Sequence, residues 1–375
     1  MRKTKVSKLV ASQTLAFLLV ACASVGPSPR VELPTTSDRF FVAGYHPYWA
    51  GDSWSTYPLD VLDELYFFEL EAGADGAIMD AHGWPDRWRP MVSAAVGAGV
   101  QVVPTISIHD ADAFRALFSD AARVDRLTGA ILGVLGSTPG LSGIHLDFEV
   151  FQTVDVSVRE GFTAFVAQLS RKMRDTDPSL SLSVFTLAFD DDDVYNERAL
   201  GQIADFLVVQ GYDFYSAGSA QAGPVGAVSG WGRLNWGTVV DRFEAFGVPA
   251  RKLVMGVPLY GYEWPVTSGE MGADVRTTGR TIPYSAEAEV LPELPRALER
   301  ATTYGKLRDP MSGSPYYTFQ TDDGWHQGWF EDAESLRAKY AFVRARGLGG
   351  IALFPLAYGT DELWNDLRRA FVRPR

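Results

Sequence analysis

The sequence has very few of the residues that build disulfide frameworks and zinc sites. It contains one cysteine and five histidines among 375 residues. A single cysteine excludes a disulfide within the chain. The histidines are scattered and show no zinc-ligand spacing. We therefore expect neither a metal nor another cofactor.

The chain also has fewer basic than acidic residues. The chain has 34 Lys and Arg against 46 Asp and Glu, which gives a formal net charge of −12. An acidic surface argues against nucleic acid or anionic lipid as a partner. No glycine-rich phosphate loop follows the first apolar run, which speaks against a doubly wound nucleotide-binding sheet.

The N-terminal segment has the layout of a secretory signal. Four basic residues and no acidic one precede an apolar run from Leu9 to Ala21, which is too short for a membrane-spanning helix. We predict a signal peptide over residues 1–21. Its removal takes away four positive charges, so the net charge of −12 becomes −16.

The chain's only cysteine, Cys22, directly follows this apolar run. The order LVAC at residues 19–22 resembles the bacterial lipoprotein signal, which is cut before a lipidated cysteine. An ordinary signal peptide with a cysteine placed there by chance is the alternative. We expect a lipid on Cys22, a flexible Pro- and Ser-rich tether over residues 22–37 and a cell-envelope location. Ala23 rather than an aspartate follows the cysteine, which suggests the outer membrane.

Eight short apolar runs alternate with helical patterns in the rest of the chain. Most runs are continuous, as expected for parallel strands that are covered on both faces. This alternation predicts a closed (β/α)8 barrel, the TIM barrel, over residues 38–372. The runs cover residues 40–45, 64–68, 100–106, 143–149, 180–186, 206–210, 253–257 and 350–354.

The interval between the seventh and eighth runs is much longer than one helix requires. It is rich in Pro, Gly, Tyr and Thr and has one short helix-like patch, residues 294–301. We predict a small inserted α+β module over residues 262–328, at the top edge of the barrel.

The fourth run carries ionisable residues at every second position. His145, Asp147 and Glu149 share one face of the predicted strand, because side chains at i, i+2 and i+4 point the same way. Placing a histidine and two carboxylates side by side costs stability unless they are paired, hydrated or used. The pattern predicts either a structural ion cluster or two acids whose pKa values are pushed apart for catalysis.

The ends of other predicted strands supply further candidate residues. Catalytic groups of barrel enzymes lie at the carboxyl ends of the strands. Each of the aromatic candidates, taken singly, is more typical of core packing, but their clustering around paired acids at strand ends favours a sugar-binding cleft. The candidates are Tyr45 on the first strand, Tyr212 and Asp213 after the sixth, Tyr260 and Trp264 after the seventh, and Phe354 on the eighth.

Four segments together resemble glycoside hydrolase family 18, the chitinases and their relatives. The segment SGIHLDFE at residues 142–149 is similar to that family's D-x-x-D-x-D-x-E signature. QGYD at 210–213 is similar to its M-x-Y-D motif, and GVPLYGYEW at 256–264 to its G-x-P-x-Y-G-x-x-W motif. The last helix and strand, around residues 335–351, also match. The resemblance covers nearly the whole chain after the tether.

The resemblance implies hydrolysis of β-1,4 bonds next to N-acetylglucosamine, with the substrate's own acetamido oxygen as the nucleophile. Glu149 matches the proton donor, and Asp147 matches the aspartate that orients the acetamido group. Tyr212 would donate a hydrogen bond to the acetamido oxygen, and Asp213 would bind sugar hydroxyls. Tyr45, Tyr260, Trp264, Phe354 and His145 are the further expected substrate-binding residues. The expected partner is a glycan that contains N-acetylglucosamine, bound by a monomer.

Two positions depart from the family signature. Ser142 and His145 stand where the family has its first and second aspartates. Relatives that resemble spore-cortex hydrolases also lack an acid at the second position, so we expect a shifted pH optimum rather than no activity. A hydrogen bond from His145 to Asp147 would transmit that effect. Chitin-type oligosaccharides are the first substrate class implied. Peptidoglycan glycan, or glycan binding without catalysis, are the alternatives.

Overall fold

The computed structural model describes residues 40–285 and 290–371. The predicted signal peptide, Cys22 and the tether lie outside the described residues. Within these ranges, none of the helices is both long enough and apolar enough to cross a bilayer.

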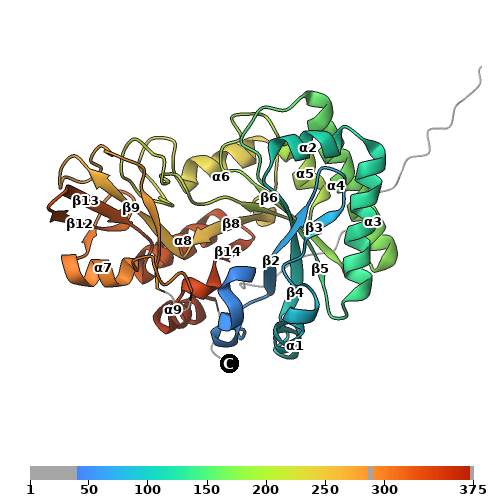
Figure 1. The fold of residues 1–375 in the computed structure, drawn as a ribbon, viewed down its shortest axis with the longest axis horizontal. Helices are drawn as coiled ribbons and strands as arrows, with labels where there is room; N and C mark the ends of the chain where they lie inside the picture. Colours follow the sequence, from blue (N-terminus) through green and yellow to red (C-terminus); the bar gives the residue numbers. More distant parts are fainter. Residues whose placement is uncertain (1–39, 286–289, 372–375) are drawn as a thin grey trace, which may run out of the picture. The chain divides into compact units, whose positions relative to one another are not determined.

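The described chain forms a closed parallel barrel, which confirms the predicted (β/α)8 fold (Figure 1). The barrel closes because β1 pairs in parallel with β2 on one side and with β14 on the other. Strand β3 (Ile78–Asp80) extends the sheet as an antiparallel partner of β2. The barrel strands are β1 (Phe41–Pro47), β2 (Glu64–Ala72), β4 (Gln101–Ile108), β5 (Gly143–Phe148), β6 (Ser181–Thr186), β7 (Phe206–Val209), β8 (Leu253–Pro258) and β14 (Gly350–Phe354).

Helices follow the strands and cover the barrel. In the longest, α4, Phe162, Phe165, Val166, Leu169 and Met173 are all buried, at the spacing of one helical face. The α-helices are α1 (Arg89–Gly97), α2 (Ala111–Phe118), α3 (Ala121–Ser137), α4 (Val156–Thr176), α5 (Glu197–Ile203), α6 (Trp236–Ala245), α8 (Ala333–Arg346) and α9 (Asp361–Phe371). The 3-10 helices are η1 (Tyr48–Thr56), η2 (Asp86–Trp88), η3 (Ala250–Lys252) and η4 (Leu356–Tyr358).

A five-stranded antiparallel sheet interrupts the barrel between β8 and α8, in the interval where we predicted the insertion. Its strand order is β10-β9-β13-β12-β11. Gly261 in β9 allows close packing against the end of β13, because a Cβ there would lie 2.0 Å from the carbonyl oxygen of Trp329. The elements are β9 (Tyr260–Val266), β10 (Arg280–Pro283), α7 (Ala297–Tyr304), β11 (Leu307–Arg308), β12 (Pro315–Thr321) and β13 (Gly324–Trp329).

Helix α8 returns the chain from this sheet to the barrel. Asp332 caps its N-terminus in a capping box with Ser335, and Gly347 ends it in the left-handed conformation at φ 61°. Strand β14 then begins at Gly350 and closes the barrel, which sets the residues at the carboxyl ends of β2, β4, β5, β7 and β14 around one opening.

Candidate active site

Strand β5 brings the two candidate acids to the carboxyl end of the barrel. Its residues are all buried, and the exposed fraction is 0% for His145 and 3% for Asp147. Glu149 follows the strand, and its amide donates a 2.9 Å hydrogen bond to the carbonyl of Ile108 at the end of β4. The neighbouring strand therefore fixes the position of Glu149.

Burial raises the pKa of both acids, which favours their protonated forms. For Glu149 burial raises the pKa to about 7; His109 acts against this shift, whereas Asp213 and Glu69 add to it. For Asp147 burial is the largest cause of the raised pKa, and the negative charges of Glu149 and Glu69 raise it further. Loss of solvent is the largest cause of the raised pKa of Glu149.

Asp147 is an acid with an incomplete set of hydrogen bonds. Its Oδ1 is buried and has no hydrogen-bond partner among the described residues. A buried carboxyl oxygen without a donor is unfavourable unless a ligand supplies one. Asp147 is therefore suited to accept a hydrogen bond from a bound molecule.

The prediction that His145 forms a hydrogen bond to Asp147 is wrong. Nε2 of His145 lies 2.9 Å from the hydroxyl of Tyr45, and Nδ1 lies 2.8 Å from the hydroxyl of Ser183. Both ring nitrogens are thus occupied, and the ring stacks on Tyr66 at a centroid distance of 4.6 Å. Burial lowers the pKa of His145 to about 3, so the ring is neutral. His145 is also too buried for the substrate contact that we expected.

Strand β7 delivers Tyr212 and Asp213 to the same opening. Asp213 adopts φ 59°, and its Oδ1 accepts hydrogen bonds from Tyr260 at 2.7 Å and Tyr262 at 2.9 Å. Burial raises the pKa of Asp213. Burial also raises the pKa of Tyr212, with the charges of Glu149 and then Asp147 as the next causes, so this hydroxyl lies near both acids.

The predicted aromatic residues divide into two groups. Tyr45 and Trp264 are 1% and 0% exposed, and Trp264 donates from Nε1 to the carbonyl of Ser216 at 3.0 Å. These two are core residues, which corrects the expectation that they form a sugar-binding surface. Phe354 is partly exposed and stacks beside Tyr212 with ring centroids 6.5 Å apart. Tyr260 is 7% exposed and acts on Asp213.

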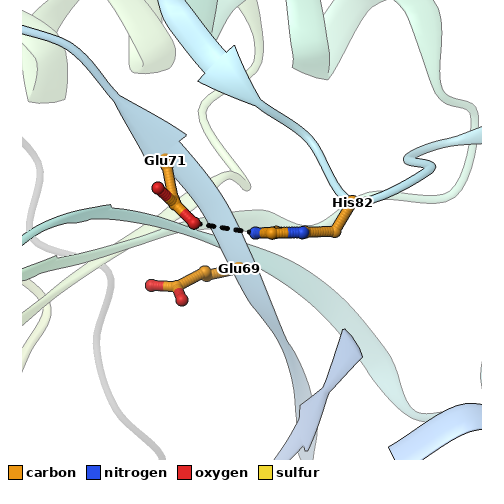
Figure 2. Close-up of side chains that lie close together, drawn as sticks. All are labelled: Glu69, Glu71 and His82. Atoms are coloured by element: carbon orange, nitrogen blue, oxygen red, sulfur yellow. Dashed lines mark hydrogen bonds and ion pairs between the residues drawn. The ribbon is translucent and has the colours of Figure 1, made fainter. Parts of the chain in front are cut away.

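A group of acids and histidines on β2 and its neighbours was not predicted from the sequence. Nε2 of His109 lies 2.8 Å from Oε2 of Glu69. Nε2 of His82 lies 2.9 Å from Oε1 of Glu71, and Figure 2 shows this pair with Glu69 beside it. The ring of His82 stacks on Tyr48 at a centroid distance of 3.5 Å. The missed signal was the pattern E-L-E at residues 69–71, two acids on alternate positions directly after an apolar run.

This group contains ligand types that could hold a metal. Single atoms of Glu69, Glu71 and His82 lie within 4.8 Å of one another. Each carboxylate, however, already has a histidine partner, Glu69 with His109 and Glu71 with His82. We therefore interpret the group as two carboxylate–histidine pairs.

A parallel barrel with two buried acids at one strand end, and a tyrosine and a third acid across the opening, is the arrangement of a carbohydrate-cleaving enzyme. The profile of the glycosyl hydrolases family 18 matches residues 89–359. The chain belongs to this family, and it is a glycosidase.

Curated relatives of the chain include both cortex-lytic and chitin-related enzymes. The chain is 24% identical over 322 residues to a cortical fragment-lytic enzyme of Bacillus anthracis, which covers 83% of this chain and 68% of that protein. It is 27% identical over 263 residues to di-N-acetylchitobiase of Rattus norvegicus, covering 62% and 68%. Two Bacillus subtilis relatives are matched over only 52% and 50% of their length.

Solved structures share the fold. A chitinase from Chromobacterium violaceum superposes with a TM-score of 0.70 at 24% identity and covers 89% of this chain and 100% of that one. The spore cortex-lytic enzyme SleL of Bacillus megaterium gives a TM-score of 0.70 at 20% identity, covering 90% and 76%. At these identities the likeness supports the barrel and leaves the substrate open.

Proposed function

We propose that this glycosidase hydrolyses β-1,4 bonds in glycans that contain N-acetylglucosamine, by substrate-assisted catalysis with retention of configuration. The observation that carries the proposal is the pairing of Asp147 and Glu149 at the end of β5, both buried and both with a raised pKa. A protonated acid is what the departing glycosidic oxygen requires.

Each neighbour of the pair has a role in this scheme. Glu149 gives its proton to the leaving oxygen. Asp147, with Oδ1 free to accept a hydrogen bond, orients the acetamido N–H and stabilises the positive charge that forms on that group. Tyr212 donates to the acetamido oxygen. Asp213 binds sugar hydroxyls and is aligned by Tyr260 and Tyr262. Phe354 supplies an apolar floor.

Chitin-type oligosaccharides and peptidoglycan are the two substrate classes to compare. The chitinase-like relatives support the first. The names of the cortical fragment-lytic relatives, and the neutral His145 in place of an aspartate, favour the second.

The test is product release by the purified chain from chito-oligosaccharides and from peptidoglycan fragments. Product from either class that disappears in Glu149→Gln would support the proposal. Binding of both glycans with no product from either would leave a glycan-binding protein and refute the proposed chemistry.

We also propose that the chain is a cell-envelope lipoprotein, anchored through Cys22. The support is the position of the chain's only cysteine directly after the apolar run. Incorporation of labelled palmitate in a bacterial host should be lost in Cys22→Ser. Retained label in that variant would contradict the anchor.

A further inference from the structure

His109 lies directly beside the proposed proton donor. Ile108 pairs with Phe148 in the parallel register of β4 and β5, so the next residues on the two strands are His109 and Glu149. The hydrogen bond from the Glu149 amide to the Ile108 carbonyl continues that register to the end of the pair. The histidine therefore occupies a fixed place at the adjacent strand end.

Glu69 holds His109 from the opposite side. Strand β2 pairs with β4 on the edge away from β5, and the side chain of Glu69 is 8% exposed against 45% for that of His109. The two groups are joined at 2.8 Å. Burial opposes a charge on His109, but the hydrogen bond to Glu69 and the charges of Glu69, Glu149 and Glu71 raise its pKa. The histidine is thus held in its cationic form to higher pH than usual.

Apart from His109, the titratable groups around Glu149 among the described residues are acids or phenols. Asp147 lies on the same strand, Glu69 on β2, and Asp213 after β7. The phenols are Tyr45 on β1, Tyr195 after β6 and Tyr212 after β7. Within residues 40–285 and 290–371, His109 is the one group acting on the Glu149 carboxyl that can carry positive charge.

We propose that His109, held by Glu69, is a positioning residue that stabilises the carboxylate formed on Glu149 during proton donation. The inference rests on the proposed function of Glu149. In the first step the acetamido oxygen of the substrate forms a bond to the anomeric carbon while the glycosidic C–O bond breaks. The leaving oxygen takes the electron pair of that bond and the proton of Glu149, whose O–H bond breaks. Glu149 regains a proton from the water that opens the intermediate. His109 keeps its own proton throughout and lowers the energy of the charged form of its neighbour.

Two substitutions at His109 separate charge from shape. His109→Gln removes the charge, so kcat should fall about tenfold, and the alkaline limb of the pH–rate profile should move to higher pH because Glu149 then holds its proton more tightly. His109→Lys keeps a cation and should retain most of the rate, with the limb near its wild-type position. A purely structural role would lower the rate at every pH without moving the limb, and that result would overturn the inference.

A second measurement does not depend on turnover. The ring protons of His109, assigned by their loss in His109→Gln, are titrated by NMR in the wild type, Glu69→Gln and Glu149→Gln. The midpoint should fall in both variants, because each removes a carboxylate that favours the cation. An unchanged midpoint in Glu149→Gln would overturn the coupling, even if glycan is cleaved. If the midpoint of His109 does fall in Glu149→Gln but the wild type cleaves no glycan, the proposed function is refuted. The catalytic role proposed for His109 and Glu149 is then refuted with it.

Discussion

Two buried acids, Glu263 in the inserted sheet and Asp147 in the barrel, have similar burial but opposite surroundings. Glu263 is 2% exposed, and its carboxylate accepts hydrogen bonds from Arg280 on one oxygen and from Tyr317, at 2.7 Å, on the other. Arg300 approaches to 3.5 Å. Asp147 is 3% exposed, and its Oδ1 has no partner among the described residues.

The contrast separates an acid whose charge is compensated within the fold from one for which we propose a ligand. Donors around Glu263 offset the cost of burying its charge. Oδ1 of Asp147 has no donor among the described residues to offset the cost of burial, and burial raises the pKa of Asp147. Substitutions that exchange these properties test the comparison directly.

The largest effect is expected for Glu149→Gln, the partner of Asp147. Loss of the proton donor should lower kcat by roughly 10²–10⁴-fold, since that is the usual contribution of a positioned acid. The measurement is product release from chito-oligosaccharides and peptidoglycan fragments, and thermal unfolding serves as the control for folding. A variant with near wild-type kcat would remove Glu149 from the mechanism.

Glu263→Gln should lower the stability of the fold and leave the catalytic activity largely unchanged. It leaves Arg280 and Arg300 without their carboxylate, which should cost about 1–3 kcal/mol of unfolding free energy in urea. The matched variant Asp147→Asn should leave stability unchanged or higher while activity is lost. Equal destabilisation in the two variants would mean that the two acids do not differ as described.

The pH dependence sharpens the same comparison. Because burial raises the pKa of Glu149 to about 7, its proton-donating form, and with it the rate, should be lost as pH rises through 7. The folded state also binds this proton more tightly than the unfolded state, so the associated stability is present at acid pH and is lost over the same interval. Thermal unfolding of Glu149→Gln should therefore show a smaller decrease between pH 5 and pH 8 than the wild type. A parallel decrease would assign the pH effect to another group.

The smallest effect is expected for Tyr262→Phe, which removes one of the two donors to Asp213. Tyr260 still donates to the same oxygen, so kcat/KM should fall only roughly 2- to 10-fold, the value of one hydrogen bond. Steady-state kinetics with one chito-oligosaccharide would measure it. A larger loss in Tyr262→Phe than in Glu149→Gln would reverse the proposed order of importance.

The sequence predicted the barrel because its strands are continuous apolar runs separated by amphipathic helices. It also placed Asp147, Glu149, Tyr212 and Asp213 at strand ends, where a parallel barrel gathers them. The partners of His145 could not be found in this way, since Tyr45 and Ser183 lie 100 and 38 positions away.

The direction in which a side chain points at a strand end could not be predicted from the sequence either. Tyr45 and Trp264 end up in the core, because an aromatic ring at a strand end can turn inward or outward without a change in sequence pattern. Glu69 was missed because the apolar run was ended at Phe68, although β2 continues to Ala72 with Glu69 buried on it.

The pairing of β1 with β14 has a consequence for synthesis of the chain. Phe41 lies beside Gly350, so a ribosome must make nearly all of the described chain before the first strand meets its last partner. Until then the edge of β1 is open to pairing with other chains. The closing strand also carries Phe354, so the proposed apolar floor of the site forms only with the final strand. A nascent chain therefore cannot assemble a complete site early, because the last strand of the barrel is also among the last segments made.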